Sequence, residues 1–152
     1  MRIFGDIPGI LEGSEFENRY YLSKYGVHKP LKAGISGSQS EGADSIILSG
    51  GYEDDEDHGD VIIYTGQGGR SEETGIQVAD QQLSRQNLAL VLNHERGLPV
   101  RVIRGSTHKS AFSPTAGYRY DGLYRLYQVE DYWQEKGVSG LLIWRFRLIK
   151  QP

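Results

Sequence analysis

The stretch LLIWRFRLI, residues 141–149, decides the fold class because its apolar and charged side chains alternate. Successive side chains of a β-strand point to opposite faces, so one face carries the apolar residues and the other carries the arginines. We predict a strand over Leu141–Ile149 with one face in a hydrophobic core. The opposite face is cationic and is either solvated or directed at phosphate groups. The apolar face holds Leu142, Trp144, Phe146 and Leu148, and the cationic face holds Arg145 and Arg147.

Several other short runs of β-branched and aromatic residues predict further strands, and 20 glycines spread along the chain predict tight turns between them. Apolar residues at helical spacing, among them Ala79 and Leu83, predict one helix from Val78 to about His94, which ends near Gly97. The fold class is therefore α+β and rich in β-structure, with a curved sheet or β-barrel and one or two packed helices. The additional strands are expected at Ser45–Leu48, Val61–Thr65, Pro99–Arg104 and Gly122–Val129.

The length of 152 residues suits one domain, 1–152, and the abrupt ends of the chain suggest a module excised from a larger protein. The absence of cysteine excludes disulfides, thiol chemistry and cysteine-bound zinc. No apolar run is long enough for a membrane span and no signal core follows the first residues, so we expect a soluble cytoplasmic protein.

The net charge of −3 argues against a polyanionic partner until its distribution is considered. Six of the 20 acidic residues fall within 53–60, which leaves 17 basic residues against 14 acidic ones in the remainder. The segment 101–152 alone holds nine basic and four acidic residues. A basic flank beside an acidic site is compatible with this pattern, and so is an ordinary surface of mixed charge.

The acidic segment 49–60 admits three interpretations. Its carboxylates and His58 can hold a divalent cation for hydrolysis, although the spacing matches no EF-hand loop. It can be a solvated acidic hairpin. It can also work with Tyr52 and Tyr64, because two aromatic faces and one carboxylate are what a flipped cytosine needs for stacking and for its N4 amino group.

A series of ordered motifs then resembles the SRA (SET and RING associated, or YDG) family over nearly the whole chain. The resemblance implies a β-barrel related to the PUA fold, which binds duplex DNA and extrudes a methylated cytosine. The motifs are Ile7-Pro8-Gly9, Gly26-Val27-His28-Lys29-Pro30, Gly50-Gly51-Tyr52-Glu53-Asp54-Asp55, Asp57-His58-Gly59, Tyr64-Thr65-Gly66, Gly68-Gly69-Arg70, Pro99-Val100-Arg101-Val102, Tyr120-Asp121-Gly122, Gly137-Val138-Ser139-Gly140 and Trp144-Arg145.

The resemblance also implies roles for residues of the pocket. Tyr52 and Tyr64 would sandwich the base, Asp55 would accept from N4, and backbone groups near Ser49, Gly51 and Thr65 would complete the Watson–Crick edge. Gln67 stands where eukaryotic members carry a small serine, and it would tune the pocket toward methyl or hydroxymethyl. Asp54, Asp57 and His58 would hold the loop, and Asp121 would be a buried acceptor.

DNA contacts outside the pocket follow from the same resemblance and from charge. The segment 71–77 is short and acidic where eukaryotic members have a longer basic finger, which removes the basis for a hemimethylated preference. The Gly/Ser-rich loop 35–42, with Ser38 and Gln39, is expected to fill the space that the base leaves, or else to be a plain connection. The candidates for backbone contact are Lys29, Lys32, Arg104, His108, Lys109 and Arg119.

We therefore expect a non-catalytic reader of 5-methylcytosine or 5-hydroxymethylcytosine in double-stranded DNA, with no cofactor or metal. Its natural place would be the recognition module of a bacterial modification-dependent restriction endonuclease, beside a nuclease domain and near the nucleoid. One alternative is a metal-dependent nuclease or hydrolase that uses Asp54, Asp55, Asp57 and His58 in the acidic 53–60 loop. Another is a protein-binding β-domain in which Tyr52 and Tyr64 form a peptide hot spot.

Overall fold

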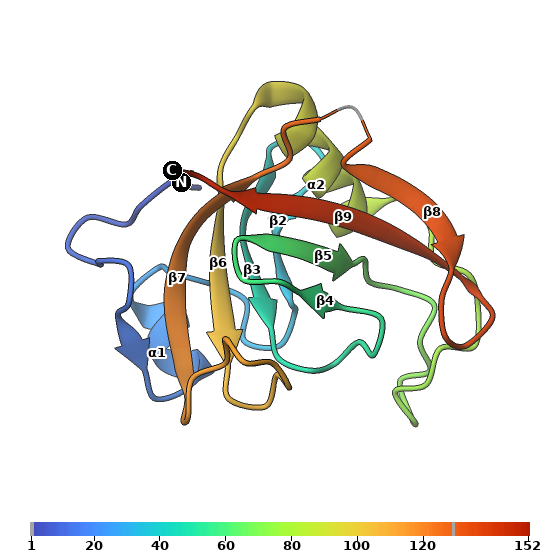
Figure 1. The fold of residues 1–152 in the computed structure, drawn as a ribbon, viewed down its shortest axis with the longest axis horizontal. Coiled ribbons are helices and arrows are strands. Elements are labelled where there is room, and N and C mark those ends of the chain that lie inside the picture. The colour runs from blue at the N-terminus through green and yellow to red at the C-terminus, as the bar shows by residue number, and fades with distance from the viewer. Residues whose placement is uncertain (1, 129) are drawn as a thin grey trace.

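A computed structural model describes residues 2–128 and 130–152 of the chain. That part contains nine strands and two helices, with α1 after the first strand and α2 between β5 and β6 (Figure 1). The elements are β1 (Glu15–Phe16), α1 (Arg19–Lys24), β2 (Ile35–Ser38), β3 (Gly42–Leu48), β4 (Glu56–Asp57), β5 (Val61–Thr65), α2 (Arg85–Arg96), β6 (Val100–Gly105), β7 (Tyr118–Arg125), β8 (Tyr132–Lys136) and β9 (Leu142–Lys150).

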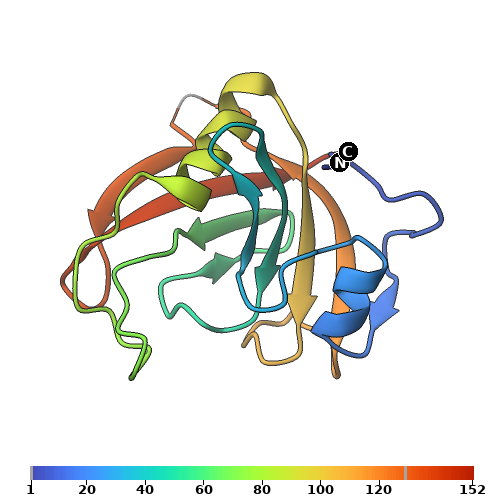
Figure 2. The ribbon, with the colours of Figure 1, turned by 180° about the vertical axis from the view of Figure 1, so that it is seen from behind.

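The strands form one mixed, strongly curved sheet in the order β2-β3-β6-β7-β9-β5-β4. β3 and β6 run parallel, while the other pairings are antiparallel. β1 joins the sheet beside β7, and β8 joins it beside β9. The described strands β2 and β4 end the path without pairing to each other, so the sheet is open. Of the two expected architectures, the curved sheet is therefore correct and the closed barrel is not (Figures 1 and 2).

Strand β9 lies where the 141–149 pattern predicts a strand, and it pairs with β5, β7 and β8. Phe146 and Leu148 are buried in the core as expected. The cationic face differs from the expectation, because Arg145 is only 5% exposed and pairs with Glu135 at 2.9 Å and Glu56 at 3.0 Å. Arg145 is thus neither solvated nor directed outward, since neighbouring strands supply carboxylates that cover it.

The predicted helix begins too early. α2 starts after the N-cap Ser84, and it ends at Gly97 in the left-handed conformation, as the sequence indicated. The preceding segment stays extended because its backbone is used elsewhere: the Ala79 N–H donates to the Gly69 carbonyl and the Gln81 N–H donates to Leu142. The six-residue helix α1, capped by the side chain of Asn18, was not predicted.

The segment 35–42 is not the aperiodic loop that was expected but the β2–β3 hairpin. Its glycine is structural, since a Cβ on Gly37 would lie 2.7 Å from the Cα of Ala43 across the bulge of this hairpin. β7 also begins earlier than the predicted 122–129 strand and ends at Arg125. Of that prediction, Val129 lies outside the described residues. The short strand β4 inside the acidic segment and strand β8 were missed, because neither shows a clear alternation.

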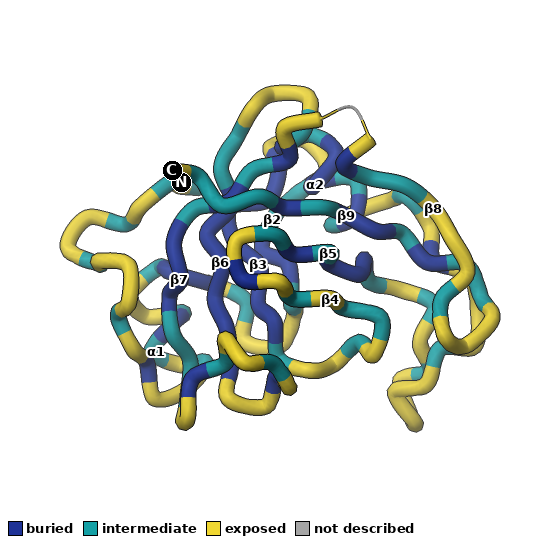
Figure 3. Tube along the Cα trace, in the orientation of Figure 1, coloured by how far each residue is buried: buried dark blue, intermediate teal, exposed yellow. Residues whose placement is uncertain are grey.

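Two hydrophobic clusters stabilise this arrangement. The larger one lies between the sheet and α2, which packs on β2 and β3, and it includes Leu90, Phe146 and Tyr64. The smaller one joins Leu22 of α1 to Tyr120 of β7. Figure 3 shows the buried chain running through the central strands, with exposed residues gathered in the loops. Among the described helices, none is long and apolar enough to cross a bilayer.

Candidate nucleic-acid interface

A cavity of about 250 Å³ opens where the ends of β3 and β5 meet the acidic segment. It gathers residues that are distant in sequence and that the motifs assigned to a base pocket. A larger cavity, of about 690 Å³, lies beside β2 and is lined by Arg2, Lys29 and Asp44, away from these motifs. The smaller cavity is the candidate site because aromatic, carboxylate and backbone groups converge there. Its wall is formed by Arg19, Lys32, Ala33, Gly34, Ile47, Ser49, Gly51, Tyr52, Asp55, Tyr64, Gln67 and Arg70.

Tyr64 forms a buried, hydrogen-bonded part of this wall. It sits on β5, is 3% exposed, and its hydroxyl is 3.2 Å from the carbonyl oxygens of both Gly34 and Ile47. Burial raises the pKa of Tyr64 well above its ordinary value, so the phenol stays neutral. Tyr52 is half-buried on the loop opposite, and the guanidinium of Arg70 lies 4.0 Å from its ring centre. The two tyrosines therefore reach the same cavity from different elements.

Asp55 supplies the carboxylate of the cavity. Its Oδ1 accepts a hydrogen bond of 2.7 Å from the backbone N–H of Thr65, the one predicted pocket residue that does not line the cavity itself. Burial raises the pKa of Asp55 to about 6, and the Thr65 hydrogen bond acts in the opposite direction. A carboxylate has about four acceptor positions, so Asp55 can accept a further N–H donor from a ligand.

Hydrogen bonds hold Asp54 and Asp57, the acidic residues on either side of Asp55. Val138 donates its N–H to Asp54 at 2.9 Å, and Arg145 donates to the Asp54 carbonyl at 2.7 Å. Asp57 receives two hydrogen bonds from Arg104, at 2.7 and 2.8 Å, and one of 2.9 Å from His108.

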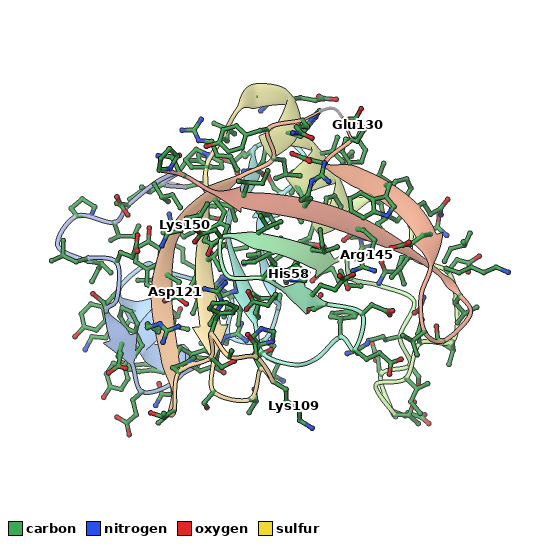
Figure 4. All side chains as sticks on the ribbon, in the orientation of Figure 1. His58, Lys109, Asp121, Glu130, Arg145 and Lys150 are labelled. Atoms are coloured by element: carbon green, nitrogen blue, oxygen red, sulfur yellow. The ribbon has the colours of Figure 1, made fainter. Side chains whose placement is uncertain are left out.

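Burial alone would raise the pKa of Asp57, but the bonds from His108 and Arg104 outweigh it and hold the pKa far below its ordinary range. The expected loop-holding role is confirmed for Asp54 and Asp57. His58 is exposed and lies 3.5 Å from Glu56, so it does not tie the loop to the sheet (Figure 4).

The carboxylates of Asp54, Asp55 and Asp57 therefore each bind different partners. Asp121, on β7, is likewise a buried acceptor, as expected, and receives a 2.9 Å bond from Arg104. Within residues 2–128 and 130–152, no group of three or more acidic or histidine side chains is placed to share a metal ion. The arrangement suits a scaffold around Asp55.

Gln67 enters the cavity from a segment that α2 holds in place. Its N–H donates to the Asn87 side chain at 2.8 Å, and Asn87 donates back to the Gln67 carbonyl at 2.8 Å. The side-chain amide of Gln67 donates to Gln86 at 3.2 Å. A Cβ on the preceding Gly66 would lie 2.8 Å from the Oδ1 of Asn87, so a larger residue there would displace this side chain.

Two of the residues predicted to contact the DNA backbone are buried. Arg104 is 3% exposed and His108 is 7% exposed, and both donate hydrogen bonds to Asp57. Arg119 is partly exposed, but its guanidinium already donates to Asp121 and to the Phe112 carbonyl. Nothing in the sequence indicated that these side chains are occupied, because only the fold brings Asp57 and Asp121 beside them.

The exposed lysines keep their predicted accessibility. Lys29 and Lys32 are exposed, and Lys32 lines the cavity. Lys109 is exposed and extends from the loop after β6 (Figure 4). All three remain candidates for phosphate contact.

Ser38 and Gln39 do not lie where a wedge is needed. They form the tip of the β2–β3 hairpin, at the start of β3, whereas Ile47 and Ser49 of the cavity lie at its other end. A seven-residue strand spans about 20 Å, so this hairpin tip cannot fill a space at the cavity mouth.

Two arginines of the cavity were not singled out from the sequence. Arg19 of α1 donates to the carbonyls of Pro30 at 2.9 Å and Ala33 at 2.7 Å, which shapes the loop that carries Lys32. Arg70 contacts Tyr52, as described above. Arg70 ends the Gly68-Gly69-Arg70 motif, so its place beside the tyrosines was a usable signal, while nothing local marked Arg19.

Comparison with known proteins places this geometry in context. Residues 3–152 match the family model of the SAD/SRA domain. The bovine E3 ubiquitin-protein ligase UHRF1 is 44% identical over 167 residues, which cover 95% of this chain and 21% of that protein. The chain thus spans about a fifth of the length of such curated relatives.

Solved structures agree with the fold. The modification dependent TagI restriction endonuclease superposes with a TM-score of 0.95 and 46% identity, covering 99% of this chain and 53% of that one. The SUVH5 SRA domain in complex with fully methylated CG DNA superposes with a TM-score of 0.80 and 43% identity, covering 99% of this chain and 95% of that one. The same domain bound to fully hydroxymethylated CG DNA superposes with a TM-score of 0.82 and 41% identity, with the same coverage of both chains. The chain belongs to the SAD/SRA domain family.

Proposed function

We propose that this chain is a reader of modified cytosine in duplex DNA, which holds the flipped base in the cavity between Tyr52, Tyr64 and Asp55. The observation that carries the proposal is the convergence of two tyrosines and a partly desolvated carboxylate on one small cavity. Aromatic faces replace the stacking that the base loses, and the carboxylate accepts from the cytosine N4 amino group. Adenine also carries an amino donor, so the shape of the cavity must contribute to selectivity.

Neighbouring groups support the same reading. Ser49 and Gly51 bring backbone groups to the cavity wall, where they can pair with the remaining Watson–Crick edge. Gln67 adds a side-chain amide that can meet a substituent on the ring. The exposed Lys32 and Lys109 would contact phosphates in this proposal, and phosphate contacts supply affinity rather than sequence information.

The relatives support the substrate and suggest a setting. SUVH5 SRA structures contain methylated or hydroxymethylated CG DNA, and TagI is named a modification dependent restriction endonuclease. We extend these properties to this chain as a proposal: it recognises 5-methylcytosine or 5-hydroxymethylcytosine, and in the whole protein it directs a fused nuclease domain in the bacterial cytoplasm, at the nucleoid. The domain itself makes and breaks no bond in this proposal.

Fluorescence anisotropy tests the proposal with three otherwise identical duplexes, which carry cytosine, 5-methylcytosine or 5-hydroxymethylcytosine at one CG step. We expect tighter binding of at least one modified duplex, and loss of that preference in Asp55→Ala. Asp60→Asn is the matched control, because it removes an exposed acid from the same segment. Equal affinity of the wild type for all three duplexes at low salt would refute the proposal.

A further inference from the structure

Arg70 contacts both the ring and the backbone of the loop that carries Tyr52. Its guanidinium lies 4.0 Å from the Tyr52 ring centre, and its Nη2 donates to the Gly51 carbonyl. Both Arg70 and Tyr52 line the base cavity, and both also line a second cavity of about 260 Å³ on the side of Glu53 and Ile76. Arg70 and Tyr52, together with Gly51, are therefore the residues that line both cavities.

The backbone beneath Arg70 is held firmly. Gly69 has φ +70°, and a Cβ there would collide with the carbonyl of Ala79. The Gly69 carbonyl accepts from the N–H groups of Val78 and Ala79, at 2.8 and 3.0 Å. Arg70 itself forms a β-bridge with Gln77, whose side chain donates to the Leu142 carbonyl of β9 at 3.2 Å. Arg70 thus projects from a backbone that is tied to β9. The segment 70–77 is the hairpin at the lower left of Figure 2.

Tyr52 is less buried than Tyr64, and the other contacts of its loop are few: the Tyr52 hydroxyl meets the backbone of Gly68, and the Thr107 hydroxyl donates to the Ser49 carbonyl. Tyr52 follows Gly50 and Gly51, and Gly50 has φ +82°, so the loop before the ring is made of the two least restricted residues. Tyr64, by contrast, is buried and held by two carbonyls. A guanidinium at this distance attracts a tyrosine face, and the bond to Gly51 fixes the backbone one residue away. Arg70 therefore adds one contact to the face of the Tyr52 ring and one to the backbone of its loop.

We propose that Arg70 is a positioning residue of the base pocket, which holds the Tyr52 ring ready for the flipped base to stack on. The assignment rests on the function proposed above, and it deepens it. A stacking surface that is ordered before DNA arrives spares the ordering cost at binding, so the effect falls on the modified base rather than on DNA in general. The competing role is an ordinary phosphate contact, which an exposed arginine can also make.

The two roles predict different results for Arg70→Ala. For a positioning residue, the ratio of affinities for modified and unmodified duplexes should fall by about 2- to 5-fold, the size of a cation–π contact. The salt dependence of binding should stay unchanged. Arg70→Lys, which keeps the charge but not the planar group or its bond to Gly51, should restore only part of the ratio. Arg96→Ala is the charge-matched control at the far end of α2.

A double-mutant cycle separates positioning from a general structural effect. In a Tyr52→Phe background, Arg70→Ala should still lower the ratio, because the ring remains. In a Tyr52→Leu background, Arg70→Ala should have no further effect on affinity for the modified duplex, because there is no ring to place. Thermal unfolding of each variant checks that the fold is retained.

Two results would overturn the assignment while leaving the proposed function intact. One is an unchanged ratio in Arg70→Ala. The other is an equal loss on both duplexes with the log–log salt slope reduced by about 0.9, which identifies a phosphate contact. A wild type without any preference for modified DNA would overturn both proposals together, so the two failures are distinguishable.

Discussion

Replacing Asp55 by asparagine should stabilise the free protein while weakening its binding to modified DNA. Burial raises the pKa of Asp55 from 3.8 to about 6. Because the folded state holds the proton more tightly than the unfolded state, the stabilisation from this proton is complete below pH 3.8 and is lost as the pH rises through about 6. At neutral pH the ionised carboxylate therefore costs stability, which asparagine would recover.

The size of the effect follows from the shift. About two pKa units correspond to about 3 kcal/mol. Because Asp55 is partly exposed, solvent screening reduces this to about 1–2 kcal/mol. The amide oxygen of asparagine can still accept from the Thr65 N–H, so no buried donor is left unpaired. We expect the melting temperature at pH 8 to rise by about 2–8 °C. Loss of the charged acceptor for N4 should weaken binding of a modified duplex by at least about tenfold.

Thermal unfolding at pH 8 and pH 5 tests the stability half of this prediction, and anisotropy tests the binding half. The difference between wild type and Asp55→Asn should shrink at pH 5, where the wild-type carboxyl is mostly protonated. Asp60→Asn, an exposed acid of the same segment, should show no comparable gain. Destabilisation of Asp55→Asn by more than about 1 kcal/mol at pH 8 would refute the reasoning, because it would mean that the ionised group contributes net stability.

Further outcomes follow from the same structure. Wild-type affinity for modified DNA should fall about tenfold per pH unit below about 6, since binding needs the ionised Asp55; titrations from pH 8 to 5 would show a flat profile if another group accepts from the base. Arg104→Met should cost about 3–5 kcal/mol in urea unfolding, because it leaves Asp57 and Asp121 without their shared cation; a loss below 1 kcal/mol would contradict this. Lys109→Ala should weaken modified and unmodified duplexes equally and lower the salt slope by about 0.9; a change in preference instead would place Lys109 at the base.

The pattern of the chain predicted strands where alternation or β-branched runs are strong. β5 matches its predicted bounds, and β9 and β6 differ from theirs by one residue at each end. Elements without a periodic pattern were missed or misplaced. The β2–β3 hairpin looked like a flexible loop because close approach of its strands requires Gly37, and glycine carries no periodicity. The start of α2 was misplaced because apolar spacing continues into a segment whose backbone pairs with Gly69.

The candidate site was predictable where motifs carry it, and not where partners come from afar. Tyr52, Asp55 and Tyr64 fall within contiguous motifs, so the sequence alone assigned them to one pocket. Arg19 shapes the loop beside the cavity from a helix that showed no signal of its own. The hairpin residues Ser38 and Gln39 were assigned to the DNA by composition, and the length of β3 removes them from the cavity.

By itself, the sequence determined the β-rich class, the central strand and the residue types of a base pocket, since these depend on local period and on contiguous motifs. Only the tertiary structure decided which charges are free. Arg104 and Arg145 are cations in the sequence, yet each is buried against carboxylates from other strands. Whether a charge meets solvent or an opposite charge depends on desolvation and on partners far along the chain, and the neighbouring residues in the sequence predict neither.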